Sequence, residues 1–248
     1  MMGTLGKTSL GQTSVGKTTK TLGVVGGLGP EATIEYYRLL VNGYRERAGG
    51  ASPPLLIHSI DVDRVLGLAA AGKREELAEY LLESVQVLAR AGADFALMSA
   101  NTPHIVFDAV ARKSPIPLLS IVEATCEFAV QRKLSNLGLL GTRFTMRSGI
   151  YQDVCTRQGI RVTLPKPEEQ NYVHEKYVGE MVKGRYLPET RAGLLAVAQR
   201  MKKDEGIDGL ILGGTEMPLL FNDNGGIGIP FVDTTRIHVN AALERMLS

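Results

Sequence analysis

The sequence of 248 residues predicts an α/β fold: two duplicated βα domains with parallel sheets, and a site in the cleft between them. Three observations support this. Short apolar runs alternate with segments of helical periodicity, which is typical of βα units. Several segments recur in the same order at a nearly constant offset. Loops rich in glycine, threonine and asparagine follow equivalent strands of the two copies. With 44% apolar and 22% charged residues, the chain has the composition of an ordinary globular protein.

The elements follow one another in regular alternation. Short β-branched or leucine-rich runs predict strands at 21–25, 54–60, 94–99, 116–121, 136–140, 160–164, 208–213 and 229–233. Between them, helical periodicity predicts helices at 31–48, 73–91, 104–113, 122–133, 145–158, 172–184, 189–204 and 236–247. Pro30 and Glu31 favour the start of the first helix, since proline suits the first helical position and an acid complements the helix dipole.

An internal repeat divides the chain. The matching segments are LGVVGGLG at Leu22 with LGLLGTRF at Leu137, GADFALMSA at Gly92 with GIDGLILGG at Gly206, and IPLLSIV at Ile116 with IPFVDTT at Ile229. Their offsets are 115, 114 and 113 residues. Chance matches would not keep one order and one spacing, so we expect two α/β halves at 21–134 and 135–248. The repeat does not decide whether the last helix of each half packs on its own sheet or on the other.

Residues 1–20 form a Gly/Ser/Thr/Lys tract with too little apolar surface to offset its ordering entropy, so we expect a flexible tail. Within it, Gly11 to Thr18 match the phosphate-loop pattern GxxxxGK[ST]. That pattern binds phosphate when a strand precedes it and a helix follows. Here a polar tail precedes it and a strand follows, so we do not expect nucleotide binding at this segment.

Charge, hydropathy and cysteine content exclude further classes. A net charge of +2 without a basic stripe argues against nucleic acid as a partner. No apolar run is long enough to cross a bilayer, and the first residues lack a signal-peptide core, so we expect a cytoplasmic protein without membrane contact. Cys126 and Cys155 have neither metal-ligand nor CxxC spacing. We therefore expect two separate, buried cysteines, no disulfide and no metal site.

Four loops are expected to form the site, because ligands of open parallel sheets bind beyond the carboxyl ends of the strands. They are residues 26–30 and 141–145 after each half's first strand, and residues 100–104 and 214–218 after each half's third strand. Their glycines permit close backbone approach, and Asn101, Thr102, Thr142 and Thr215 offer short hydrogen-bonding side chains.

A dinucleotide site is the alternative for the first loop, because Gly27 to Ala32 match GxGxxA between a strand and a helix. The ribose-binding acid of that motif lies about 20 residues further on, whereas the acid here, Asp61, follows Gly29 by about 30. Glu31 would also repel a pyrophosphate at the start of the helix. We therefore do not expect nicotinamide or flavin binding.

The loop motifs together resemble the aspartate/glutamate racemases that work without pyridoxal phosphate. The resemblance covers residues 22–248 and rests on GGLGPEAT (Gly26 to Thr33), ANTPH (Ala100 to His104), LLGTRFTM (Leu139 to Met146), LGGTEMPLL (Leu212 to Leu220) and IPFVDTTRIH (Ile229 to His238). It implies two duplicated α/β domains with the site between them, no cofactor, and a small dicarboxylic amino acid or related carboxylate as ligand. It also implies a homodimer.

The resemblance implies a two-base reaction, in which one cysteine removes the α-proton from one face and a second returns a proton to the other. Thiols in an electropositive loop can change protonation near neutral pH. The family carries these cysteines directly before the Asn-Thr and Thr-Glu pairs of the two third-strand loops. Ala100 and Gly214 occupy those positions here. Neither side chain can transfer a proton, so the standard mechanism is not expected.

The resemblance implies roles for several of the remaining residues. Asn101, Thr102, Thr142 and Thr215 would hold the amino-acid carboxylate, and the first loop, with Gly27, would close over the ligand. Lys176 would bind the second carboxylate, with Lys183 and Arg143 as alternatives. His104 and Glu216 are the titratable residues closest to the vacant positions and could act as bases, followed by His58 and Asp61. The alternatives are a hydrogen-bonding role at a helix start for His104 and orientation of its own loop for Glu216. For His174 and His238 we expect surface or packing roles.

Three functions remain open at this stage. The first is an amino-acid racemase relative that acts on an acidic amino acid without the thiol pair. The second is a catalytically inactive homologue that binds a carboxylate. The third is a one-base enzyme, such as a lyase or decarboxylase, acting on a related dicarboxylate. If the pocket is intact, Ala100→Cys together with Gly214→Cys should restore racemisation.

Overall fold

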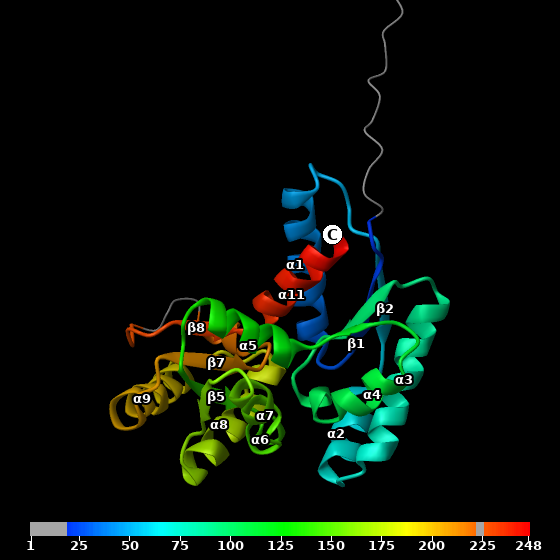
Figure 1. The fold of residues 1–248 in the computed structure, drawn as a ribbon. Helices are drawn as coiled ribbons and strands as arrows, with labels where there is room; N and C mark the ends of the chain where they lie inside the picture. The colour runs from blue at the N-terminus through cyan, green and yellow to red at the C-terminus, as the bar shows by residue number, and fades with distance from the viewer. Residues whose placement is uncertain (1–18, 222–225) are drawn as a thin grey trace, which may run out of the picture.

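The computed structural model describes residues 19–221 and 226–248, and these form two parallel four-stranded sheets flanked by helices (Figure 1). The N-terminal sheet has the order β2-β1-β3-β4 and the C-terminal sheet the order β6-β5-β7-β8. The strands are β1 (Leu22–Gly26), β2 (Leu55–Ser59), β3 (Phe95–Met98), β4 (Leu118–Leu119), β5 (Asn136–Gly141), β6 (Arg161–Thr163), β7 (Gly209–Gly213) and β8 (Phe231–Asp233). The predicted α/β class and the duplicated parallel sheets are thus confirmed.

The central strands are buried along their whole length, which explains why they are continuous apolar runs in the sequence. Every residue of β1, β3, β5 and β7 is buried. The two central strands of each sheet pair in parallel, with Leu22 opposite Phe95 in one sheet and Leu137 opposite Gly209 in the other. The two repeats therefore have the same number of strands, and these strands have the same order within their sheets.

Helices cover both sheets. They are α1 (Pro30–Arg47), α2 (Val62–Ala70), α3 (Arg74–Arg90), α4 (Phe107–Lys113), α5 (Ile121–Gln131), α6 (Arg143–Arg147), α7 (Ile150–Thr156), α8 (Pro167–Gly179), α9 (Pro188–Glu205), α10 (Met217–Leu220) and α11 (Thr234–Met246). Two 3-10 helices, η1 (Thr102–Val106) and η2 (Met181–Lys183), precede α4 and follow α8.

The helices differ from the sequence prediction in several places. The helix predicted at 145–158 is divided into α6 and α7, because Gly149 adopts φ 82, in the left-handed region. Helix α2 was not predicted. Asp61 caps it by accepting a hydrogen bond from the amide of Asp63, and this capping residue was the available sequence signal.

The last helix of each repeat packs on the other repeat's sheet. In α11, Val239 and Leu243 join the core cluster formed by β1, β3 and α1. In α5, Ile121 and Cys126 join the core of the C-terminal sheet. Figure 1 shows α11 against α1 and α5 beside β7 and β8. The question that the repeat left open is answered: the two helices are exchanged between the halves.

Cys126 on α5 and Cys155 on α7 form a disulfide, with their Cα atoms 5.4 Å apart. The expectation of two separate cysteines was wrong, although both side chains are fully buried as expected. The physical reason is the helix exchange. It carries α5 from the first repeat into the C-terminal core, and a separation of 29 residues in the sequence gives no sign of this approach.

Three expectations from the sequence concern a phosphate loop, a membrane span and a metal site. The phosphate-loop match at Gly11 to Thr18 lies outside the described residues. Within residues 19–221 and 226–248, no helix is long and apolar enough to span a membrane. The same residues contain no group of three or more histidine, cysteine, aspartate or glutamate side chains arranged to hold a metal ion.

Candidate functional site

The four predicted loops meet in two equivalent pairs across the halves. The loop after β3 meets the loop after β5, where Thr102 Oγ1 lies 3.3 Å from Thr142 Oγ1. The loop after β1 meets the loop after β7, since a Cβ built on Gly29 would lie 3.4 Å from Glu216 Oε1. Because β1 corresponds to β5 and β3 to β7, the two contacts are related by the duplication. The structure thus brings the predicted loops together at the carboxyl ends of both sheets.

The loop after β1 is tied to its own half. Gly27 adopts φ 77, and a Cβ there would lie 2.2 Å from the carbonyl oxygen of Ile60, so only glycine fits. The amide of Gly27 donates to Thr33 Oγ1 at 2.9 Å. Thr33 Oγ1 is also 3.5 Å from Ser99 Oγ, at the end of β3. Thr33 therefore holds the loop over the sheet, a role that the sequence analysis missed.

Asn101, in the N-terminal half, is held by two side chains of the C-terminal half. Its Oδ1 accepts a hydrogen bond from the Tyr151 hydroxyl on α7 at 2.6 Å, and its Nδ2 donates to Thr234 Oγ1 at 3.2 Å. Thr234 in turn donates to the carbonyl of Leu212 on β7 at 2.9 Å. Burial raises the pKa of Tyr151, so its phenol stays protonated and remains a donor. Asn101 is thus a fixed part of the contact between the halves.

His104 forms backbone hydrogen bonds at the start of η1 and α5, which leaves neither ring nitrogen free for the alternative role of a base. Its Nδ1 donates to the carbonyl of Ala100 at 2.9 Å, and its Nε2 accepts from the amide of Ile121 at 3.1 Å. Both ring nitrogens are therefore occupied by backbone groups. Burial lowers the pKa of His104 from 6.5 to about 4. The residue is a neutral structural link between η1 and α5.

The space beside Gly214 is filled by an aromatic ring from another element. A Cβ at Gly214 would lie 2.4 to 2.7 Å from ring atoms and the hydroxyl of Tyr177 on α8. The Tyr177 hydroxyl donates to Glu216 Oε2, and Thr215 Oγ1 donates to the same oxygen at 2.8 Å. Burial and the neighbouring Glu216 carboxylate raise the pKa of Tyr177. Tyr177 is another residue that the sequence analysis missed, although its neighbour Lys176 on the same helix was expected at the site.

The basic residues predicted to bind a second carboxylate lie in different settings. Lys176 Nζ pairs with Glu180 Oε1 at 2.5 Å, and Lys183 is exposed, so neither joins the loop contacts. Arg143 follows Thr142 directly, and its Nε is buried without a hydrogen-bond partner. The amide of Arg143 donates to His174 Nδ1 at 3.2 Å. Burial first, and then the charge of Arg143, lower the pKa of His174. Of the three predicted basic residues, only Arg143 thus has a buried side-chain nitrogen without a hydrogen-bond partner among the described residues.

The lower-ranked candidates have local roles. His58 Nδ1 lies 2.7 Å from Ser84 Oγ on α3. Asp61 caps α2, so the acid considered for a dinucleotide ribose is used within its own helix. His238 is fully buried on α11, where Nδ1 lies 2.9 Å from the Tyr36 hydroxyl and Nε2 donates to the carbonyl of Leu119 at 3.1 Å. A packing role for His238 was expected.

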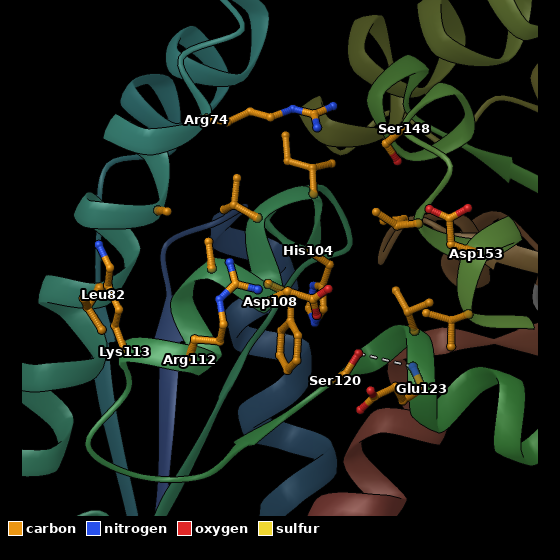
Figure 2. Close-up of a pocket in the computed structure, with 18 of the residues that line it drawn as sticks. Arg74, Leu82, His104, Asp108, Arg112, Lys113, Ser120, Glu123, Ser148 and Asp153 are labelled. Carbon is orange, nitrogen blue, oxygen red and sulfur yellow. Dashed lines mark hydrogen bonds between the residues drawn. The ribbon is translucent and has the colours of Figure 1, made fainter. Parts of the chain in front are cut away.

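A groove of about 630 Å³ lies beside the loop contact, between α3 and α4 of one half and α5 and α7 of the other (Figure 2). His104 is at its floor, but the other predicted ligand residues do not line it. Its walls carry both charges, including Arg74 and Arg112 opposite Glu123 and Asp153. Burial, and then the nearby carboxylates of Glu127 and Asp108, raise the pKa of Glu123. The groove is thus distinct from the meeting point of the loops.

Gly214→Cys is expected to lower the free energy of unfolding by about 1–3 kcal/mol, because the new side chain must displace the buried Tyr177 ring. In a Tyr177→Ala background, which leaves room for a side chain, the same substitution should cost less. Urea unfolding of the four proteins of this double-mutant cycle measures the difference. Equal costs in the two backgrounds would show that Tyr177 does not fill this space. Restoring both thiols therefore also requires that Tyr177 be moved.

Comparison with known proteins identifies the family. The sequence profile of the Asp/Glu/Hydantoin racemase family matches residues 25–242. The chain belongs to this family. Among curated relatives of this racemase-family chain, the broad specificity amino-acid racemase RacX of Bacillus subtilis (strain 168) is 26% identical over 150 residues. That match covers 57% of the chain and 63% of RacX, so less than two thirds of the relative's length is spanned.

Solved structures of the racemase family match more of the chain. An Asp/Glu racemase candidate from Yersinia pestis is 32% identical with a TM-score of 0.85, and the match covers 92% of this chain and all 100% of that one. An aspartate racemase homologue from Pyrococcus horikoshii OT3 is 30% identical with a TM-score of 0.80 and the same coverage. The two-sheet arrangement is therefore that of the racemase family.

Proposed function

We propose that this chain binds a small dicarboxylic amino acid, or a related carboxylate, where its four loops meet, and that it does not racemise through a pair of thiols. The names of its relatives support an amino-acid ligand. The hydroxyls of Thr102 and Thr142, which contact each other across the halves, are donors of the kind that bind a carboxylate. The Thr215 hydroxyl donates to Glu216 and the Asn101 amide to Thr234. We expect no cofactor, and a homodimer by resemblance alone.

One observation carries the mechanistic part of the proposal: the volume beside Gly214 belongs to the Tyr177 ring. Racemisation needs a proton donor and a proton acceptor on opposite faces of the α-carbon. Position 100 offers a methyl group and position 214 a hydrogen atom. The chain has two cysteines, and both are in the disulfide. In the oxidised protein no thiol is therefore available at either face.

Arg143 supports the choice of an acidic ligand. A buried guanidinium nitrogen without a partner leaves a donor unsatisfied, and a carboxylate can satisfy it. Arg143 is adjacent to Thr142, whose hydroxyl contacts Thr102 across the halves. A ligand carboxylate that enters between these threonines would exchange their mutual contact for bonds to its own oxygens.

A second candidate function is favoured by Glu216. This carboxylate is buried, accepts from Tyr177 and Thr215, and faces the first loop at Gly29. A carboxylate held in this way can exchange a proton with one face of a bound substrate. That chemistry suffices for a one-base lyase or decarboxylase acting on a related dicarboxylate, and it does not suffice for inversion.

Incubation with L-aspartate or L-glutamate in deuterium oxide tests these functions. We expect the amino acid to bind, as measured by calorimetry, and to keep its L configuration, as measured by chiral chromatography. α-Deuteration with retained configuration, detected by proton NMR and lost in Glu216→Gln, would favour the one-base enzyme. Inversion of either amino acid would contradict the proposal.

Variants at Arg143 test whether this residue binds a carboxylate of the ligand. Arg143→Met keeps much of the side-chain length and removes the charge, so it should weaken binding by about tenfold or more. Lys176→Met is the matched control, because its ammonium is already paired with Glu180, and it should leave the affinity unchanged. Similar losses in the two variants would argue against a carboxylate beside Thr142.

A further inference from the structure

Residues 100–104, which form the loop after β3, accept hydrogen bonds from two helices. On one side, the amide of Ile121, the first residue of α5, donates to His104 Nε2 at 3.1 Å. On the other side, the Tyr151 hydroxyl of α7 donates to Asn101 Oδ1 at 2.6 Å. All four residues are buried. The position of this loop therefore depends on where α5 and α7 lie relative to each other.

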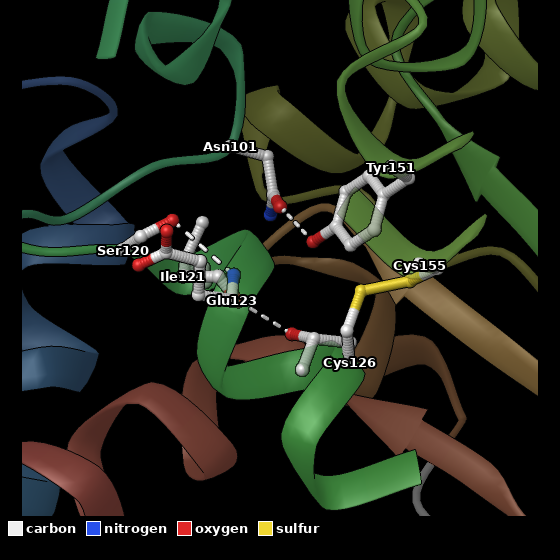
Figure 3. Close-up of a disulfide and its surroundings, with 8 residues drawn as sticks. Asn101, Ser120, Ile121, Glu123, Cys126, Tyr151 and Cys155 are labelled. Carbon is white, nitrogen blue, oxygen red and sulfur yellow. Dashed lines mark hydrogen bonds between the residues drawn. A yellow bond between two sulfur atoms is a disulfide. The ribbon is translucent and has the colours of Figure 1, made fainter. Parts of the chain in front are cut away.

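The disulfide joins the same two helices (Figure 3). Cys155 follows Tyr151 by four residues on α7, so the two side chains share one face of that helix. Cys126 lies on α5, one turn beyond Ile121 and Val122. The loop, α5 and α7 are thus linked in a ring. One hydrogen bond joins the loop to each helix, and the disulfide joins the two helices.

Helix α7 is short, and the chain turns at both of its ends. It spans Ile150–Thr156, about two turns, and helices of this length are not stable by themselves. Gly149 before it and Gly159 after it both adopt positive φ, so the chain turns at each end. Packing in the C-terminal core and the link to α5 must therefore hold Tyr151 at the distance at which it reaches Asn101.

We propose that the Cys126–Cys155 disulfide is a redox-controlled brace that holds residues 100–104 for ligand binding, with Tyr151 as the positioning residue for Asn101. When the disulfide is reduced, α7 can move away from α5 and the loop is held less firmly. The effect on ligand affinity rests on the proposed function; the effect on loop mobility does not.

The chemical step is a thiol–disulfide exchange with a dithiol. A thiolate of the dithiol attacks one sulfur of the pair, the Cys126–Cys155 bond breaks, and the second thiol of the reductant releases the mixed disulfide. The protein gains two electrons and two protons as two thiols, and the dithiol becomes a cyclic disulfide. Both sulfurs are fully buried, so the exchange requires local opening of α5 or α7.

The test compares the oxidised full chain with the same chain reduced by dithiothreitol. Hydrogen exchange followed by mass spectrometry should show exchange about tenfold faster in peptides that contain residues 100–104 and 150–156 of the reduced protein. Peptides of α3, on the N-terminal half, should exchange equally in both forms. Equal exchange of the loop in both forms would overturn the proposal. So would the detection of two free thiols when the protein is denatured without dithiothreitol, because the disulfide would then be absent.

Two variants and one ligand complete the test. Tyr151→Phe keeps the ring and the disulfide but removes the hydroxyl, so the loop should exchange faster even when oxidised. Cys126→Ala/Cys155→Ala should resemble the reduced chain and should not respond to dithiothreitol. L-Aspartate should bind the reduced chain about tenfold more weakly, the loss expected from about one hydrogen bond. If neither form binds L-aspartate while loop exchange still differs, the proposed function fails and the brace stands; equal binding by both forms removes its role in affinity.

Discussion

Lowering the pH from 7 to 5 is expected to reduce the free energy of unfolding by about 4 kcal/mol, because two buried histidines must stay neutral in the folded protein. Burial lowers the pKa of His104 from 6.5 to about 4. Burial, and then the neighbouring His104, lower the pKa of His238 from 6.5 to about 3. Both rings also use their two nitrogens in hydrogen bonds that suit the neutral form.

The direction of the effect follows from where the protons bind. Below pH 6.5 the unfolded chain takes up a proton at each histidine, whereas the folded chain does not until its lower pKa is reached. Stability is therefore complete above 6.5 and is lost as the pH falls, down to about 4 for His104 and about 3 for His238. Each pH unit costs about 1.4 kcal/mol for each group, or about 2 kcal/mol at pH 5.

Urea unfolding at pH 7 and pH 5 measures this loss, and His238→Gln is the informative variant. Glutamine has a hydrogen-bonding side chain that does not titrate, so the variant should lose about half of the pH dependence. Raised pKa values of Glu123 and Asp233 act in the opposite direction. The test is therefore the difference in pH dependence between the variant and the parent. If the variant has the same pH dependence as the parent, the role assigned to His238 is wrong.

Reduction of the disulfide is expected to lower the free energy of unfolding by about 3.5 kcal/mol. The bond closes a loop of 29 residues, and the loss of this constraint increases the entropy of the unfolded chain. In the folded state the expected change is confined to α7 and residues 100–104, since the rest of the C-terminal core keeps its apolar contacts.

Denaturant unfolding at pH 7 with and without a dithiol measures this effect. The control is Cys126→Ala/Cys155→Ala, whose midpoint should be lower than that of the parent and should not respond to the dithiol. A parent protein with the same midpoint in both redox states would contradict the prediction.

The sheets could be predicted from the sequence because parallel strands buried on both faces are short continuous apolar runs. All eight strands lie within a few residues of their predicted positions. The duplication also predicted that four loops of the two halves lie in one region, where Thr102 Oγ1 is 3.3 Å from Thr142 Oγ1. Those inferences depend on local pattern and on symmetry, and both are properties of a single sequence.

The remaining features depend on distances between segments that the sequence does not relate. Tyr177 fills the space at Gly214, and Cys126 reaches Cys155, only because helices from elsewhere pack there. His104 has the pKa of a suitable base when exposed, but in this fold the amide of Ile121 and the carbonyl of Ala100 occupy its nitrogens. Residue type therefore indicated which groups lie near the meeting loops and not the role of each group.

The exchange of α5 and α11 makes each repeat incomplete without the other. If the chain were cut between the repeats, the N-terminal sheet would lose the apolar side chains that α11 packs against Leu22 and Phe95. The C-terminal core would lose Ile121, Val122 and Cys126 in the same way. Both fragments would expose core surface to water. The smallest autonomous unit of this architecture is therefore the pair of repeats.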